Sequence, residues 1–353
     1  MEETMKKQWN DLKLFRGIVG LLIVAVLLTV TACAPKEATA PEPAAPTETT
    51  SNQKPPKGDM GGGMDGGTLD TSAITQKELD IPYGTISDTQ KLDIYYPNEA
   101  SSEPYPVIIA IHGGAFKMGS KTGGDLAPML EGVNHGYAVV TVDYRLSDEA
   151  IFPAAISDVK AAIRFIKANA QQYNLNPDKI ATWGDSAGGN LAALAGTSGD
   201  DASLNGDNSE NLNVSSAVNA VVDWFGPIDF LLMDEQFAAA GITPIMGSTS
   251  SDNSPESQYI GGNITQNVEQ TEKANPENYI TAGDPAFFIQ HGSADQNVPT
   301  QQSINLAEKL TVVLGSEKVT LTILEGAGHG GAAFEAADNL DKVFAFLDGV
   351  LKK

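Results

Sequence analysis

The sequence is poor in cysteine and histidine, and both scarcities limit what the chain can do. Cys33 is the only cysteine among 353 residues, so neither an intrachain disulfide nor a zinc site built on several thiolates is possible. The four histidines stand at positions 112, 135, 291 and 329. No two of them have the close spacing that is typical of metal ligands, so we expect no metal site.

Basic residues are also scarce. Lys and Arg number 22 against 45 Asp and Glu, which gives a formal net charge of -23. Binding to nucleic acid needs a basic surface, and so does electrostatic docking on anionic lipid. The charge therefore argues against both partners. Because 41% of the residues are hydrophobic, we expect most of the chain to bury a core.

The first 32 residues have the pattern of a targeting segment. Basic residues between positions 6 and 16 precede a charge-free apolar run from Gly17 to Thr31. This run is shorter than the roughly 20 residues that a membrane span needs, but it suits the core of a signal peptide. It ends in Val30-Thr31-Ala32-Cys33, which resembles the bacterial lipobox. There the cysteine is diacylated and the chain is cut before it.

Two acyl chains anchor a protein firmly, whereas one alone binds only marginally. We therefore expect a lipoprotein signal peptide over 1–32, lipidation of Cys33 and an extracytoplasmic position on a bacterial cell membrane. The alternative is an uncleaved anchor helix that ends in an incidental cysteine. Residues 33–67 are rich in Pro, Thr and Gly, and such a segment buries too little apolar surface to fold. It is predicted to be a lipid-anchored, disordered linker.

Residues 68–353 alternate strand-like runs with amphipathic helical patterns, which predicts a single α/β domain with a mostly parallel central sheet flanked by helices. Short, β-branched and almost wholly apolar runs are typical of strands that are buried on both faces. Such runs occur at 107–111, 137–142, 180–183, 220–224, 286–289 and 319–324, with possible edge strands at 77–81 and 92–96. Residues 227–283 break this rhythm, and we expect them to form a cap-like insertion over one end of the sheet.

The sharpest local motif is Gly184-Asp185-Ser186-Ala187-Gly188, directly between a predicted strand and a predicted helix. G-x-S-x-G alone is a weak signal, but this context is the one that a nucleophile elbow requires. The serine occupies a strained turn, and its neighbours two positions away must be small. Ser186 is therefore the predicted nucleophile. Asp185 is interpreted as a neighbour of the elbow without a catalytic role.

A second motif offers an oxyanion hole. His112-Gly113-Gly114-Ala115-Phe116 follows the predicted strand at 107–111, and consecutive glycines let backbone N–H groups approach a developing oxyanion. The predicted donors are the amides of Gly113, Gly114 and Ala187. His112 is interpreted as a residue that braces the loop.

The acid and the base should follow in that order, each after a strand. Asp295 comes after the strand at 286–289, and His329 comes after the strand at 319–324. His329 would take the serine proton and return it to the leaving group, while Asp295 would fix the tautomer of the imidazole. His135 precedes a strand, and His291 lies too close to a strand end to reach the serine. Both are therefore interpreted as structural.

Together these motifs resemble the α/β-hydrolase superfamily, and within it the carboxylesterases of the hormone-sensitive-lipase-like and bacterial feruloyl-esterase-like groups. The stretches that carry the resemblance are HGGAF (112–116), DYRL (143–146), FPAAISDVKAAIRF (152–165), GDSAGGN (184–190), FGPID (225–229), SPESQYIGG (254–262), HGSADQNVP (291–299) and GAGHG (326–330). The resemblance implies ester hydrolysis through an acyl-enzyme, without a cofactor. Ala115 departs from the lipase-like branch, which usually has a third glycine there. Asp158 is interpreted as a residue behind the site or at a helix start.

The predicted activity is hydrolysis of short acyl esters, acetyl or aryl such as feruloyl, on small molecules or polymers. The insertion has few large apolar runs beyond Phe230 to Met233, so a hydrophobic lid of the lipase type is not expected. Two alternatives stay open. One is a serine peptidase of the prolyl-oligopeptidase type, although the HGG loop is more typical of esterases. The other is a catalytically silent surface-binding protein with the same fold.

Overall fold

The computed structural model describes residues 67–353. The predicted signal peptide, Cys33 and almost all of the predicted linker lie outside the described residues. Within 67–353, no helix combines the length and the apolarity needed to cross a bilayer. The central feature is an eight-stranded sheet in the order β1-β2-β4-β3-β5-β6-β7-β8.

The first two strands are antiparallel to their neighbours, and all later pairs are parallel. The strands are β1 (Lys77–Pro82), β2 (Lys91–Tyr95), β3 (Tyr105–Ile111), β4 (Ala138–Val142), β5 (Leu175–Asp185), β6 (Ala220–Trp224), β7 (Ala286–Gly292) and β8 (Val319–Leu324). This confirms the predicted mostly parallel sheet and the presence of strands at both predicted edge positions. Of these two, however, only β1 is an edge strand, because β2 pairs with both β1 and β4, so the edge prediction for 92–96 is wrong. The antiparallel β1 and β2 lie at one edge of the sheet.

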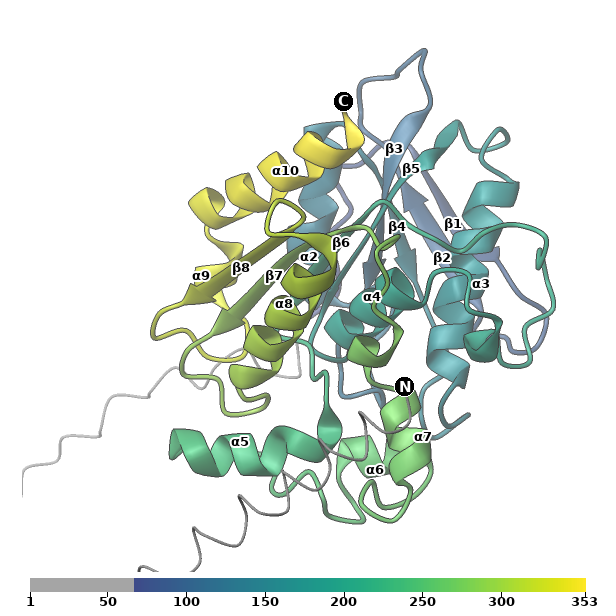
Figure 1. Ribbon diagram of the computed structural model, residues 1–353. Helices are drawn as coiled ribbons and strands as arrows, with labels where there is room; N and C mark the ends of the chain where they lie inside the picture. The colour runs from purple at the N-terminus through teal and green to yellow at the C-terminus, as the bar shows by residue number, and fades with distance from the viewer. Residues whose placement is uncertain (1–66) are drawn as a thin grey trace, which may run out of the picture. The chain divides into compact units, whose positions relative to one another are not determined.

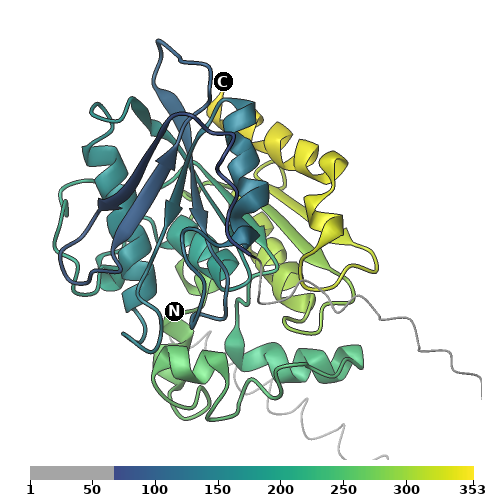
Figure 2. The same ribbon diagram turned by 180° about the vertical axis from the view of Figure 1, so that it is seen from behind.

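Helices cover both faces of the sheet (Figures 1 and 2). One face packs against α3 (Ala154–Ala168), α4 (Ala187–Ser198) and α8 (Gln301–Leu314). The other face packs against α2 (Ala127–Leu130) and α10 (Ala337–Leu351), with α9 (Ala332–Glu335) just before α10. Short 3-10 helices complete this part of the chain: η1 (Gly124–Leu126), η2 (Glu131–His135) and η3 (Ala202–Leu204).

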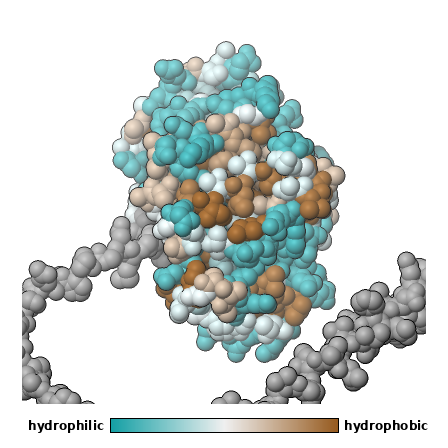
Figure 3. Space-filling view, turned by 60° about the vertical axis from the view of Figure 1, so that its left-hand side comes forward, coloured by the Kyte–Doolittle hydropathy of each residue, from teal (hydrophilic) through white to brown (hydrophobic). Residues whose placement is uncertain are grey.

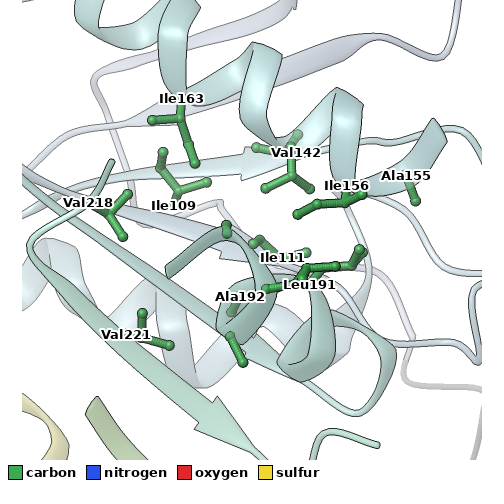
Figure 4. Close-up of a cluster of buried hydrophobic side chains, with 14 of the residues drawn as sticks. Ile109, Ile111, Val142, Ala155, Ile156, Ile163, Leu191, Ala192, Val218 and Val221 are labelled. Carbon is green, nitrogen blue, oxygen red and sulfur yellow. The ribbon is translucent and has the colours of Figure 1, made fainter. Parts of the chain in front are cut away.

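The alternation of side chains along β3 shows why both faces are buried. Ile109 and Ile111 belong to the core under α3 and α4, whereas Ile108 and Ala110 belong to the core under α2 and α10. Figure 4 shows the first of these cores, where α3 and α4 bring Ile156, Ile163 and Leu191 against the sheet. Burying every side chain of a strand requires an uninterrupted apolar run, which is what the sequence has at 107–111.

The predicted insertion at 227–283 contains five short helical segments. They are η4 (Phe230–Leu232), α5 (Met233–Ala240), α6 (Pro255–Ile260), α7 (Val268–Lys273) and η5 (Pro276–Tyr279). In Figure 1, α5, α6 and α7 lie together below the sheet, away from the helices that flank it. The backbone amide of Ile245 donates to the carbonyl of Gln296, which ties the insertion to the segment after β7.

Asp158 is not a helix-start residue, so that part of its interpretation is wrong. It lies inside α3 with no exposed surface, and its carboxylate accepts hydrogen bonds from Nε and Nη2 of Arg145 at 2.9 and 2.8 Å. Gln90 and Asn208 donate to the same carboxylate. A buried charge needs such partners, and these contacts join α3 to the residue before β2 and to the loop after β4.

Candidate functional site

Ser186 lies on a tight turn between β5 and α4. Its φ of 52° and ψ of -121° are unfavourable for a residue with a side chain, so the surrounding packing must hold it there. A Cβ on Gly184 would lie 2.1 Å from the Gly188 carbonyl oxygen, and one on Gly188 would lie 2.1 Å from that of Ile111. Both glycines of the motif are therefore required by close backbone contacts. The turn lifts the Ser186 hydroxyl beyond the end of the sheet.

Ser186, His329 and Asp295 form a hydrogen-bonded chain. Nε2 of His329 lies 2.9 Å from Oγ of Ser186, and Nδ1 of His329 lies 2.7 Å from Oδ2 of Asp295. Asp295 follows β7 and His329 follows β8, so two neighbouring parallel strands deliver the acid and the base to the same edge as the serine. With the proton on Nδ1, Nε2 is free to accept the serine proton.

Asp295 is held in its ionised form. Its Oδ1 accepts the backbone amides of Asn297 and Val298 at 2.7 and 2.9 Å. Burial by itself would raise the pKa of this carboxyl group, but the charge of His329 and hydrogen bonds from His291 and His329 hold the pKa well below its usual range. A carboxylate in this state orients the imidazole and stabilises its protonated form.

His291 is buried behind this acid, and its contact with Asp295 was not predicted. Its Nε2 lies 3.3 Å from Oδ2 of Asp295 and 3.0 Å from the carbonyl oxygen of Val298, while its Nδ1 lies 2.7 Å from Oγ of Ser303. The sequence interpretation of His291 as structural considered only its reach toward the serine. The spacing of His291 and Asp295, four positions apart across the end of β7, was the signal in the sequence for this contact.

The oxyanion loop differs from the prediction at Gly113. The Gly113 amide, a predicted oxyanion donor, donates instead to Oδ2 of Asp125 at 3.2 Å. Gly114 and Ala115 follow with φ of 103° and 56°, and within the described residues their amides donate to no protein acceptor. Ala187 begins α4, where the first amides have no intrahelical acceptor. The unpaired amides next to Ser186 are therefore those of Gly114, Ala115 and Ala187.

Asp185 and Asp125 pack beneath the same loop. Burial, together with the nearby Asp125, raises the pKa of Asp185 well above its usual range. A Cβ on Gly113 would lie 2.9 Å from Oδ2 of Asp185, so the loop rests directly on this carboxyl group. Asp185 therefore precedes the nucleophile in sequence and also contacts the oxyanion loop at Gly113.

His112 and His135 both stack on aromatic rings. The His112 ring lies 4.3 Å from that of Tyr144, whose hydroxyl donates to the His112 carbonyl oxygen at 2.9 Å. These contacts brace the loop from below, and burial lowers the pKa of His112. His135 stacks on Phe344 at 3.8 Å and does not line the cavity.

A cavity of about 350 Å³ opens over Ser186 and His329. Its apolar walls include Met118, Trp224, Phe225 and Phe334, and the insertion contributes Met246 and Glu256. The face shown in Figure 3 has apolar residues gathered across its middle, between hydrophilic regions. Met118 and Met246, which line the cavity, are also exposed at the surface.

Among residues 67–353, no three His, Cys, Asp or Glu side chains gather into a group that could hold a metal ion. The cavity brings together Ser186, His329 with Asp295 behind it, and the adjacent amides. A nucleophile, a base and free amide donors around one reacting atom are the parts that acyl transfer requires.

Comparison with known proteins agrees with this arrangement. Residues 92–310 match the model of the BD-FAE family. Esterase LipC of Mycobacterium tuberculosis is 30% identical over 241 residues, which are 68% of this chain and 57% of LipC. The chain thus spans about half the length of the curated relatives it matches.

Two solved structures are similar as well. One, described as a truncated form of a carbohydrate esterase from gut microbiota, is 30% identical with a TM-score of 0.71, covering 81% of this chain and 100% of that one. The other, a bifunctional GH43-CE protein of Bacteroides eggerthii, is 35% identical with a TM-score of 0.68, covering 77% of this chain and 35% of that one. The chain has the α/β-hydrolase fold and belongs to the BD-FAE family.

Proposed function

We propose that this protein is a serine carboxylesterase that hydrolyses short acyl esters through an acyl-enzyme. The observation that carries the proposal is the hydrogen-bonded chain from Ser186 through His329 to Asp295 beneath an open cavity. The esterase names of the relatives and of the similar structures support it.

In the first half-reaction, Oγ of Ser186 attacks the ester carbonyl carbon while its proton moves to Nε2 of His329. The carbonyl oxygen becomes an oxyanion, which the unpaired amides of Gly114, Ala115 and Ala187 bind. His329 then gives its proton to the alcohol oxygen, the carbon–oxygen bond of the ester breaks, and the acyl group stays on Ser186. In the second half-reaction, water attacks the acyl carbonyl carbon while His329 takes its proton. The bond to Oγ of Ser186 then breaks, His329 returns the proton to Ser186, and the carboxylic acid product leaves.

The size of the cavity and the descriptions of the similar structures support a substrate class. About 350 Å³ suits a small acyl group with part of its alcohol and is too little for a long-chain triglyceride. Two similar structures carry the words carbohydrate esterase or GH43-CE in their descriptions. We assign acetyl or small aryl esters on a carbohydrate as the substrate. The proposal also includes the N-terminal signal peptide, with a lipid anchor at Cys33 and an extracytoplasmic position. Polymer-linked esters are accessible there.

A panel of p-nitrophenyl acetate, butyrate and laurate, assayed with the full chain and with Ser186→Ala, tests this proposal. Serine-dependent turnover that is fastest on acetate is the expected result. Faster turnover of laurate than of acetate would overturn the short-chain assignment. Short peptide amides belong in the same panel, since cleavage of these in preference to every ester would favour the peptidase alternative. A folded chain that turns over no substrate would favour the catalytically silent surface-binding protein.

Lipidation is tested separately by intact mass after expression in a bacterial host. A diacylated N-terminus at Cys33, lost in Cys33→Ser together with membrane association, is the expected result. An unmodified thiol on a membrane-associated chain would favour the uncleaved anchor helix.

A further inference from the structure

The insertion brings one carboxyl group into the cavity that the proposed reaction does not use. Glu256 lies in the first turn of α6, and it lines the same cavity as Ser186 and His329. Ser254 caps this helix by accepting the Ser257 amide at 3.0 Å, and Pro255 occupies its first turn. These features fix the start of α6 and therefore the direction in which Glu256 leaves the backbone.

No basic side chain compensates this carboxyl group. The residues that line the cavity include no Lys and no Arg, and within 67–353 Glu256 forms no ion pair. Burial is the main cause that raises its pKa to about 7, and the negative Asp234 adds to the rise. Near neutral pH the group can therefore both accept and donate a hydrogen bond.

The surroundings of Glu256 narrow what could bind it. Trp224, Met118 and Met246 give the cavity apolar walls, and Glu256 adds a carboxyl group to a lining that also includes Asn297 and Glu335. A sugar ring has this pattern, since it presents apolar C–H faces and hydroxyl groups at its edge. A neutral hydroxyl can pair with this carboxyl group in either protonation state, whereas a cation pairs well only with the ionised form. Anionic alcohols would be repelled.

We propose that Glu256 hydrogen-bonds a free hydroxyl of the alcohol part of the substrate, and so selects sugar esters over esters of plain alcohols. This inference rests on the proposed esterase function. It makes Glu256 a specificity-determining residue, separate from the groups that break the ester bond.

Three acetyl esters test the inference in the full chain: a monoacetylated methyl xyloside with free hydroxyls, its fully acetylated counterpart, and p-nitrophenyl acetate. The variants are Glu256→Leu and Glu256→Gln, with Glu235→Gln as the matched control. Glu235 belongs to the same insertion, is exposed and does not line the cavity.

The quantity to compare is the ratio of kcat/KM on the monoacetylated xyloside to kcat/KM on p-nitrophenyl acetate. Loss of one hydrogen bond to this group should lower the ratio by about tenfold in Glu256→Leu. We expect a smaller drop in Glu256→Gln, no drop in Glu235→Gln, and no preference of Glu256→Leu for the monoacetylated over the fully acetylated sugar. A thermal unfolding midpoint at or above that of the unmodified chain would show that the variant is folded.

An unchanged ratio in Glu256→Leu would overturn the inference, and so would an equal fall of kcat/KM on all three esters. Acetylcholine serves as a fourth substrate, and a larger loss on it than on the sugar ester would assign Glu256 to a cation instead. The proposed esterase function fails on a different result, namely the absence of Ser186-dependent turnover of p-nitrophenyl acetate by the unmodified chain.

Discussion

Nε2 of His291 lies 3.3 Å from Oδ2 of Asp295, and neither side chain has any exposed surface. The same oxygen lies 2.7 Å from Nδ1 of His329, so one carboxylate oxygen serves two imidazoles. The imidazole of His329 faces the serine, and the imidazole of His291 lies behind Asp295. We therefore regard His291 as a positioning residue that acts through Asp295.

Replacing His291 by Phe keeps a ring but removes its N–H. We expect kcat to fall by about ten- to hundredfold with little change in KM, because a hydrogen bond to a charged group is worth about 1.5–3 kcal/mol. His291→Gln should recover part of the loss, and His135→Phe, away from the cavity, should leave kcat unchanged. If His291→Phe lowers only the unfolding temperature and kcat stays the same, the residue is merely structural.

The oxyanion loop offers a matched pair of substitutions. In Gly114→Ala, the new Cβ would lie 2.2 Å from the Met118 carbonyl oxygen at a φ of 103°, so the loop must shift. We expect kcat to fall by about a hundredfold or more, the typical cost of losing one oxyanion donor. Ala115→Gly should keep its activity and lose no stability, because glycine adopts the φ of 56° more readily than alanine does. Steady-state kinetics and thermal unfolding check both variants, and an active Gly114→Ala would remove this loop from the oxyanion site.

Asp223 predicts a pH-dependent stability. It is buried in β6 with Oδ2 unpaired, and burial raises its pKa to about 6. Since the ordinary value is 3.8, the folded state binds more protons than the unfolded state between pH 3.8 and about 6. The favourable contribution of the protonated group is fully present below that interval and is lost as the pH rises through it.

We therefore expect Asp223→Asn to gain stability relative to the unmodified chain as the pH rises from 4 to 7. The gain should be on the order of 2–3 kcal/mol, since one pKa unit corresponds to about 1.4 kcal/mol. Denaturant unfolding at both pH values measures it. A difference in stability that stays constant between them would contradict the shifted pKa.

The motif residues and the strands were predictable because their signals are local. Uninterrupted apolar runs such as 107–111 identify strands that are buried on both faces, and parallel strands end at one edge of a sheet. It follows that Ser186, Asp295 and His329, each just after such a run, should lie near one another. The chain order of serine, acid and histidine then assigned each residue a position.

The contacts between distant segments were not predictable. The Gly113 amide donates to Asp125, which lies in η1, a segment without a motif of its own. The sequence therefore offered no reason to remove Gly113 from the oxyanion donors. Glu256 reaches the cavity only because the insertion folds back over the sheet, and the Ser- and Gly-rich sequence of 227–283 does not encode that path in any periodic pattern. Asp158 resembled a helix-start residue, yet its role depends on Arg145 from a different segment.

Hydrolysis of p-nitrophenyl acetate by the full chain and by Ser186→Ala, with a fluorophosphonate probe applied to both, tests the central claim most directly. The account predicts a loss of kcat of roughly four powers of ten or more in the variant, and covalent labelling of Ser186 that the variant lacks. A folded Ser186→Ala that keeps its turnover, or a label found on another residue, would contradict it.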